Sequence, residues 1–172
     1  MRIPMVAALL VAALFAASPA SAAEATPAQG GFVPAPQEAF ELPAGARCDF
    51  AVKGQPVVDE VRKLVISSNP DGTPQRELFV GDLIVEVTNT ETGAKTLADA
   101  SGSALVEHHA DGSQTWFAVG PVLLGFRENA GTLPRGLWLV DGVYTVEFSP
   151  DLIHKTITMV RGTTHNVCTD ID

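Results

Sequence analysis

Residues 137–149 read LWLVDGVYTVEFS, with Asp141 and Gly142 between two apolar runs. An Asp-Gly pair in this position is typical of a two-residue hairpin turn, because the central residues of such turns need a positive φ that glycine adopts without strain. The pattern predicts strands at 137–140 and 143–149 with a tight turn between them. Antiparallel β structure is therefore the expected class for this part of the chain.

Turn-forming residues also separate apolar runs along the rest of the chain. Turn residues cluster at 69–72 (NPDG), 91–93 (ETG) and 110–113 (ADGS), between runs rich in β-branched and aromatic residues. Such clusters predict hairpins. The other expected strands are 47–53, 57–66, 77–80, 83–89, 95–100, 104–109, 115–126 and 155–161. No helix of ordinary length is expected, although the apolar residues of 57–66 also fit helical spacing.

The predicted fold is an all-β antiparallel meander that forms a small β-barrel. A barrel is favoured because the connections are short and sequential and because closure removes exposed strand edges. A β-sandwich is the alternative, since it has the same spacing of strands.

The chain has two cysteines, Cys48 and Cys168. In an exported protein an even pair predicts a disulfide, which needs Cα atoms about 4.4 to 6.8 Å apart. A bridge that closes so large a loop stabilises a fold by about 4 to 5 kcal/mol on the chain-entropy model. The first and last strands are therefore expected to be near neighbours.

The N-terminal region divides into two expected segments. Residues 1–22, MRIPMVAALLVAALFAASPASA, have one positive charge, a short apolar run and a small-residue end, which is typical of a secretory signal peptide. Residues 23–41 are rich in Ala and Pro and are expected to form a flexible leader. Residues 42–172 are expected to form a single all-β domain, secreted to the medium or the cell envelope.

Charge excludes some partners. The chain has 11 basic and 20 acidic residues and a net charge of −9. Nucleic acid is an improbable partner, because phosphate binding needs a concentrated basic surface. An anionic membrane surface is disfavoured for the same reason, and no stable membrane insertion is expected once the signal peptide is cleaved.

The sequence contains few candidates for chemistry. His108 and His109 are consecutive at the end of an expected strand, so their side chains should project to opposite faces and cannot easily share a metal ion. His109 with Glu107 is a weak acid–base candidate. Nucleophile-elbow, phosphate-loop, dinucleotide and calcium-loop motifs are missing. We therefore predict no catalytic, cofactor-binding or metal-binding residue, and no cofactor.

Two runs, 115–126 and 137–140, are apolar without regular polar alternation. Strands of this kind are covered on both faces by a second layer, a loop, a ligand or a partner. Their aromatic residues, which are candidates for ligand contacts or for the core, are Trp116, Phe117, Phe126 and Trp138.

Four segments carry a resemblance: LIVEVTNTETGAKT, HHADGSQTWFAVGPVLLGF, LPRGLWLVDGVYTVEF and GTTHNVCTDI. Together they resemble a group of small exported proteins from actinobacteria, over about residues 48–168. The resemblance implies a signal peptide, a cysteine near each end of the domain and a hairpin-rich β domain. These proteins are functionally uncharacterised, so the resemblance implies no catalytic residue.

Three functions are compatible with these patterns. The preferred one is a secreted, non-enzymatic β domain that binds a small apolar ligand or a protein partner. The second is a small-barrel enzyme of cyclase or isomerase type, as in the allene oxide cyclase-like barrels, which would use Glu107, His109 and Tyr144. The third is an inhibitor or cell-envelope interaction protein with the loop 127–136 as its contact element.

Overall fold

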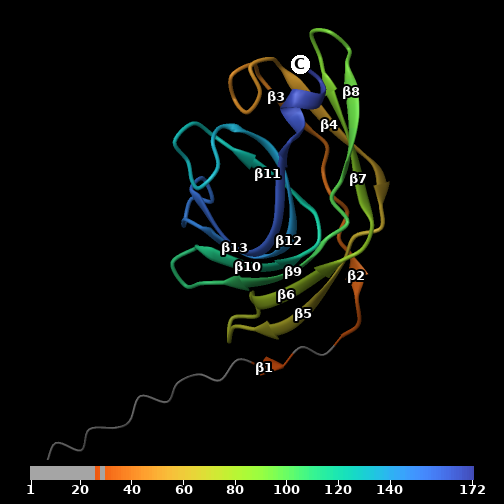
Figure 1. Cartoon of the computed structure of the whole chain (residues 1–172). Coiled ribbons are helices and arrows are strands. Elements are labelled where there is room, and N and C mark those ends of the chain that lie inside the picture. Colours follow the sequence, from red (N-terminus) through yellow and green to blue (C-terminus); the bar gives the residue numbers. More distant parts are fainter. Residues whose placement is uncertain (1–25, 28–29) are drawn as a thin grey trace, which may run out of the picture.

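The computed structural model describes residues 26–27 and 30–172, and almost all of its regular structure is β (Figure 1). The predicted all-β class with antiparallel pairing is confirmed. The strands are β1 (Thr26–Pro27), β2 (Val33–Pro34), β3 (Phe40–Leu42), β4 (Val52–Asp59), β5 (Arg62–Ser68), β6 (Pro74–Val80), β7 (Leu83–Asn89), β8 (Lys95–Asp99), β9 (Ser103–His108), β10 (Gln114–Val119), β11 (Val122–Phe126), β12 (Gly136–Phe148) and β13 (Lys155–Asn166), and a 3₁₀ helix η1 (Val167–Asp170) follows them.

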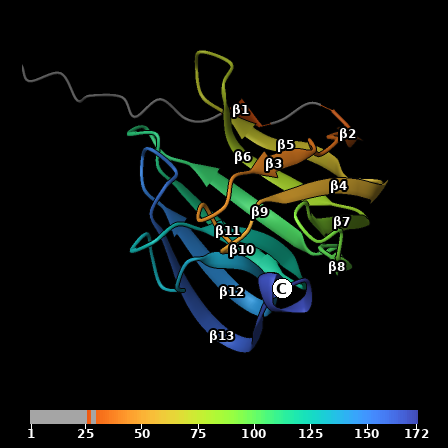
Figure 2. The same ribbon diagram turned by 90° about the horizontal axis from the view of Figure 1, so that it is seen from above.

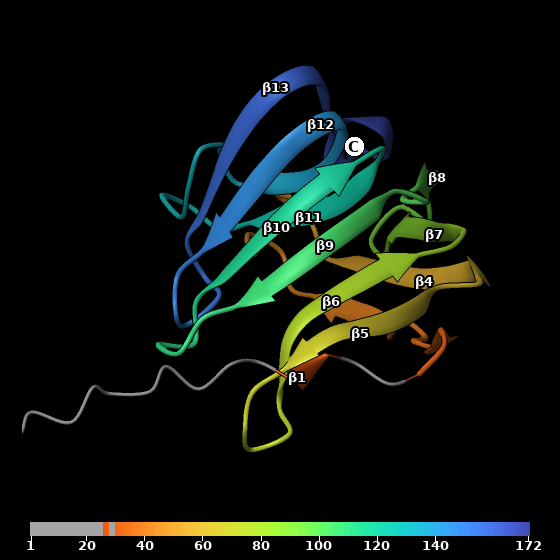
Figure 3. The same cartoon turned by 90° about the horizontal axis from the view of Figure 1, so that it is seen from below.

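The described strands form two sheets. The small sheet has the order β3-β4-β7-β8. The large sheet has the order β1-β5-β6-β9-β10-β12-β11, with β13 on β12 and β2 on β5, and it curls strongly along its length (Figure 3). The predicted closed barrel is not found among the described strands.

The chain forms two sheets because it crosses between them four times, from β2 to β3, β4 to β5, β6 to β7 and β8 to β9. The Glu60 N–H donates to the Asp82 carbonyl at 2.8 Å, and the Leu83 N–H donates to Ser101 Oγ at 3.0 Å. Strands that change sheet at bends form corners of this kind. A simple meander, in which each strand pairs with the next, was therefore the wrong expectation for residues 52–103.

The predicted hairpin at Asp141 and Gly142 is wrong, because β12 runs without interruption from Gly136 to Phe148. Along one edge β12 pairs with β13, and Gly142 lies opposite Gly162. Along the other edge it pairs first with β11 and then with β10. Because neighbouring strands satisfy the backbone of both halves, the Asp-Gly pair makes a bend inside one long strand.

The bend depends on glycine at both paired positions. Gly142 has φ 141° and Gly162 has φ 147°. A Cβ on Gly142 would overlap the Arg161 carbonyl oxygen, and one on Gly162 would overlap the Asp141 carbonyl oxygen. Two glycines that face each other thus let β12 and β13 turn together.

Other predicted strands are corrected in their boundaries. The expected strand 57–66 divides into β4 and β5, and 115–126 divides into β10 and β11 at Gly120 and Pro121. The predicted hairpins at 69–72, 91–93 and 110–113 are confirmed as the β5–β6, β7–β8 and β9–β10 connections. In two of them an aspartate caps the turn: Asp71 Oδ1 accepts from the Thr73 N–H and Asp111 Oδ1 accepts from the Ser113 N–H, each at 2.9 Å.

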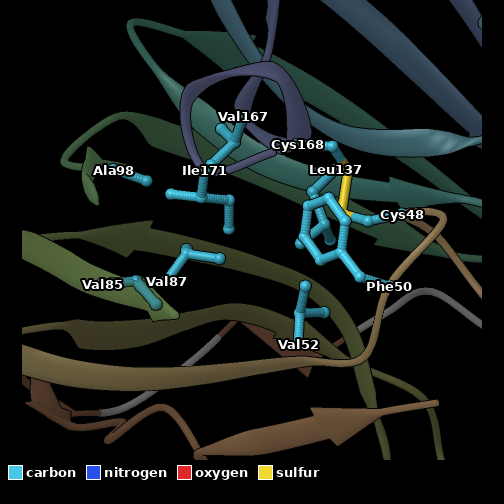
Figure 4. Packing of buried hydrophobic residues seen from close by; sticks show 10 residues of the cluster. All are labelled: Cys48, Phe50, Val52, Val85, Val87, Ala98, Leu137, Val167, Cys168 and Ile171. Atoms are coloured by element: carbon cyan, nitrogen blue, oxygen red, sulfur yellow. A yellow bond between two sulfur atoms is a disulfide. The ribbon is translucent and has the colours of Figure 1, made fainter. Parts of the chain in front are cut away.

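Two hydrophobic clusters form the interior. The stapled cluster lies between the small sheet and η1 (Figure 4) and consists of Cys48, Phe50, Val52, Val85, Val87, Ala98, Leu137, Val167, Cys168 and Ile171. The curled cluster lies within the bend of the large sheet and consists of Ala104, Val106, Ala118, Leu124, Phe126, Val140, Tyr144, Val146 and Phe148.

The predicted disulfide between Cys48 and Cys168 is confirmed, with Cα atoms 5.5 Å apart. It joins the segment before β4 to η1, however, and β4 and β13 lie in different sheets. The bridge brings together the segment before β4 and the segment after β13, as the expectation of near neighbours requires, although these two strands belong to different sheets and do not pair. A disulfide indicates an oxidising compartment.

The N-terminal region differs from expectation where it is described. Within the expected flexible leader 23–41, β2 pairs with β5 and β3 pairs with β4 (Figure 2). The ring of Phe40 occupies the space that a Cβ on Gly54 would need, so a glycine in β4 admits this side chain. The predicted signal peptide, 1–22, lies outside the described residues. In the described part of the chain, no helix has the length and apolar character to cross a membrane.

Candidate ligand-binding cleft

An apolar cleft opens at the corner where the chain crosses between the sheets. Its volume is about 260 Å³. The end of β6, the start of β7, β9, β10 and the start of β11 all contribute to its walls. The side chains that define it are Phe79, Leu83, Ala104, Val106, Trp116 and Val122.

Register explains why these side chains meet. Phe79 lies directly opposite Ala104 in the β6–β9 pair, and Val106 lies opposite Trp116 in the β9–β10 pair. Residues opposite each other in antiparallel strands share a face, as do residues two apart in one strand. Phe79, Ala104, Val106 and Trp116 therefore form one continuous apolar patch on the concave face of the large sheet.

Trp116 is held at two points. Its Nε1 donates to Gln114 Oε1 at 2.9 Å. Its ring centre lies 4.7 Å from that of Phe148, with the planes tilted by 44°. The side chain remains half-buried. Trp116 is thus fixed in place, packed against the curled cluster, while it also lines the cleft.

An ion cluster lies on the same face beside the cleft. Glu77 is opposite Val106 and only 5% exposed. Its Oε1 accepts from Lys63 Nζ and its Oε2 accepts from His108 Nε2, both at 2.9 Å. Lys63 Nζ also lies 6.0 Å from the centre of the Phe79 ring. The cluster therefore lies next to Phe79 and Val106 of the cleft without lining the cleft itself.

The protonation of Glu77 follows from these contacts. Burial by itself would raise the pKa of Glu77, but the hydrogen bonds from Lys63 and His108 outweigh it and hold the pKa below its usual value. Glu77 is therefore ionised at neutral pH. A buried carboxylate with two donors is satisfied, whereas the same group without them would destabilise the fold.

The four predicted aromatic residues do not form one site. Trp116 faces the cleft, and Phe126 is fully buried in the curled cluster. Trp138 packs against that cluster and donates from Nε1 to the Pro134 carbonyl at 2.9 Å. Phe117, the neighbour of Trp116, points to the opposite face and is 44% exposed. Of the four, only Trp116 is placed to contact a ligand in the cleft.

The three residues considered for acid–base chemistry are likewise separate. Glu107 pairs with Arg76 at 2.8 Å, and His109 Nε2 lies 2.9 Å from Thr115 Oγ1. Tyr144 is buried, and its hydroxyl donates to the Val140 carbonyl at 2.9 Å. Burial, and secondarily the charge of Asp141, raises the pKa of Tyr144, so it stays protonated.

Within the residues described, no three His, Cys, Asp or Glu side chains are placed to hold a metal ion. His108 instead contacts Glu77, away from the Thr115 hydroxyl that lies beside His109. The two adjacent histidines therefore contact different partners.

The loop 127–136, predicted as a contact element, is bonded to β13. The Thr132 N–H donates to the Lys155 carbonyl, and the Lys155 N–H donates to the Ala130 carbonyl, each at 3.0 Å. Gly131 forms a parallel bridge with Lys155. The loop thus covers the beginning of β13.

Sequence reasoning missed most of the cleft. Phe79, Leu83 and Val122 were placed in strands but not in a site, and Glu77 was not singled out. The available signal was the two-residue spacing of Glu77 and Phe79 in an apolar strand, which puts both on one face. Only the register with β9 shows what that face meets.

No protein family, no curated protein and no solved structure matches the chain. The resemblance to exported actinobacterial proteins stays a prediction.

Proposed function

We propose that this protein binds a small apolar ligand in the cleft beside Trp116, without catalysis, outside the cytosol. The observation that carries the proposal is a cavity of about 260 Å³ walled by apolar side chains, one of them a fixed and half-buried tryptophan. Ligand sites of this kind are concave and mostly apolar, with a few polar groups at the margin.

The volume limits the class of ligand. A cavity of about 150 Å³ holds benzene, whereas sites for drug-sized molecules measure roughly 300 to 1,000 Å³. The cleft lies between these limits. It fits a substituted single ring or a short acyl chain, and it excludes long isoprenoids from complete enclosure.

The fold supports the same proposal. The large sheet curls around the curled cluster, and the cleft lies at the margin of that cluster. A sandwich description of the two sheets leaves the cleft unchanged. The disulfide suits an exported protein, because such bonds persist in oxidising compartments.

Fluorescence tests the proposal directly, because Trp116 and Trp138 are the only two tryptophans. In a Trp138→Phe variant, all tryptophan emission comes from Trp116. We expect saturable changes when this variant is titrated with p-cresol or hexanoate. In a Trp116→Phe variant, the remaining Trp138 emission should not respond.

A blocking variant identifies the site. Ala104 lies in the floor of the cleft, so Ala104→Leu in the Trp138→Phe background should fill part of the space and weaken binding at least about tenfold, which is about 1.4 kcal/mol. The matched control is Ala110→Leu, in the exposed β9–β10 turn. The proposal fails if neither ligand class gives a saturable change, or if Ala104→Leu binds as well as the control.

A further inference from the structure

The segment that precedes β3 supplies part of the wall of the apolar cleft. β2 pairs with β5 of the large sheet, and β3 pairs with β4 of the small sheet. Residues 35–39, which connect β2 to β3 and which we call the strap, therefore cross from one sheet to the other. Gln37, in the middle of the strap, lines the cleft together with Val61. A part of the chain that lies before the expected domain thus belongs to the candidate site.

Backbone contacts hold the strap in place. The Ala35 N–H donates to the Val61 carbonyl at 2.9 Å, and the Gln37 N–H donates to Asp59 Oδ2 at 2.6 Å. Asp59 is itself oriented, because its Oδ1 accepts from the Val61 N–H at 3.3 Å. Both contacts of the strap use backbone N–H groups, so the position of Gln37 does not depend on its own side chain.

Gln37 stands out chemically from the other walls of the cleft. Among the described residues that line it, only Gln37 and Trp116 have a polar group in the side chain. The polar group of Trp116 is already used, because its Nε1 donates to Gln114 Oε1 at 2.9 Å. The amide of Gln37 is therefore the side-chain group that a ligand in the cleft can reach with a hydrogen bond.

One contact sets which way this amide faces. Gln37 Nε2 donates to the Ala35 carbonyl at 2.8 Å. A carbonyl only accepts, so the nitrogen end of the amide has to face Ala35, and Oε1 lies on the other side of the group. Oε1 can accept from a ligand, and a hydroxyl is the simplest neutral group that donates to it.

Charge also limits the ligand. None of the described residues that line the cleft is charged. Lys63 lies next to Phe79, but it is not a lining residue, and its Nζ donates to Glu77 Oε1 at 2.9 Å. A carboxylate in the cleft would lose its hydration without gaining a paired cation, which costs several kcal/mol or more.

We infer that the ligand of the cleft is a neutral molecule with one hydroxyl group, and that Gln37 Oε1 selects it by accepting from that hydroxyl. A single-ring phenol or a short alcohol has this chemistry. The inference rests on the proposed function, because it describes the ligand of the same cleft. Gln37 is exposed, so water competes for the contact and its effect on affinity is that of one ordinary neutral hydrogen bond.

Two probes that differ only in the hydroxyl test the contact: p-cresol and toluene. In the Trp138→Phe background, whose tryptophan emission comes from Trp116, Gln37→Met keeps the length of the side chain and removes the amide. We expect this change to weaken p-cresol binding by about threefold to tenfold and to leave toluene binding unchanged.

The matched control is Gln55→Met. Gln55 is also an exposed glutamine whose Nε2 donates to a backbone carbonyl, that of Pro56 at 3.5 Å, and it does not line the cleft. This variant should bind both probes as the parent does.

The outcomes separate this inference from the proposed function. Unchanged p-cresol binding by Gln37→Met would overturn the inference, and so would an equal loss for p-cresol and toluene, because Gln37 would then contribute only packing. In either case saturable binding by the parent still supports the apolar site. If neither probe gives a saturable change in the parent, both proposals fail.

A second pair of probes tests the charge of the ligand. Hexanol and hexanoate have chains of equal length, and at neutral pH only hexanoate is an anion. Hexanol should bind at least about tenfold more tightly, because no lining residue described here compensates a carboxylate. Hexanoate that binds as tightly as hexanol would contradict a site for neutral ligands.

Discussion

The stapled cluster and the curled cluster differ in what encloses them. The stapled cluster lies between elements that are far apart in the sequence, and the Cys48–Cys168 bridge closes it across a separation of 120 residues. The curled cluster is enclosed mainly by successive strands of one sheet that bends at Gly142 and Gly162. The stapled cluster is closed by a covalent bridge, whereas the curled cluster has the open cleft at its margin.

The difference separates a region with fixed, buried contacts from the region that we propose binds a ligand. Beside the stapled cluster Asn89 is buried, and its side-chain amide donates to the Ile171 carbonyl at 2.9 Å, which holds the segment after η1 in place. At the margin of the curled cluster Phe79, Trp116 and Val122 are only partly buried. Apolar surface that remains accessible on a rigid support is available for a ligand.

Removal of the disulfide should have the largest effect. Cys48→Ser with Cys168→Ser should lower the free energy of unfolding by about 4 to 5 kcal/mol, because the unfolded chain gains the entropy of an open loop. Urea denaturation measures the change. Reductant should lower wild type to the level of the variant and leave the variant unaffected. A loss below about 1 kcal/mol would show that the sheets hold together without the bridge.

Aromatic truncation compares a buried and an exposed position in two strands that follow each other in the chain, β11 and β10. Phe126→Ala should cost about 3 to 5 kcal/mol, because a fully buried ring leaves a cavity. Phe117→Ala is the control, since its ring is 44% exposed, and it should cost under about 1 kcal/mol. Thermal and chemical unfolding measure both costs. If Phe126→Ala and Phe117→Ala lower the free energy of unfolding equally, the two rings are not on the faces assigned to them.

The bend of β12 at Gly142 can be tested by adding one methyl group there. Gly142→Ala should cost about 3 kcal/mol, because the added Cβ overlaps the Arg161 carbonyl and alanine is strained at φ 141°. Gly31→Ala, where a Cβ meets nothing, is the control and should stay within about 0.5 kcal/mol of wild type. Wild-type stability of Gly142→Ala would show that the long strand does not need this bend.

The smallest expected effect concerns Glu77 and pH. Its pKa is lower in the folded chain than the ordinary value of about 4.3, so its contribution to stability is present above that value and is lost as the pH falls through the folded pKa. The free energy of unfolding should therefore fall less steeply in acid for Glu77→Gln than for wild type. Denaturant titrations at a series of pH values measure both slopes, and identical slopes would exclude this role.

Local signals predicted the local structure well. The turns at 69–72, 91–93 and 110–113 were predicted because each contains a glycine, which adopts a positive φ there, and in two of them an aspartate side chain accepts from a turn N–H. The Asp-Gly pair at 141–142 was misread because its immediate sequence is that of a hairpin. Its conformation depends on β10, β11 and β13 beside it, and no local pattern contains them.

The cleft shows the same limit of prediction from sequence. Trp116 was predicted as a candidate from its apolar surroundings, but Phe117 and Phe126 were predicted with it and face other environments. Alternation decides which residues of one strand share a face. It does not decide which strand lies opposite, so Phe79 and Glu77 could not be assigned to the site of Trp116.

By itself the sequence determined the all-β class, the positions of the short turns and the pairing of its two cysteines, because these depend on residue type and on a single possible connectivity. Tertiary structure alone decided that the chain crosses between two sheets, that β12 bends, and that an apolar cleft opens at the margin of the large sheet. The physical reason is that register and sheet order are fixed by contacts between distant segments, which bury side chains that the sequence cannot bring together by pattern alone.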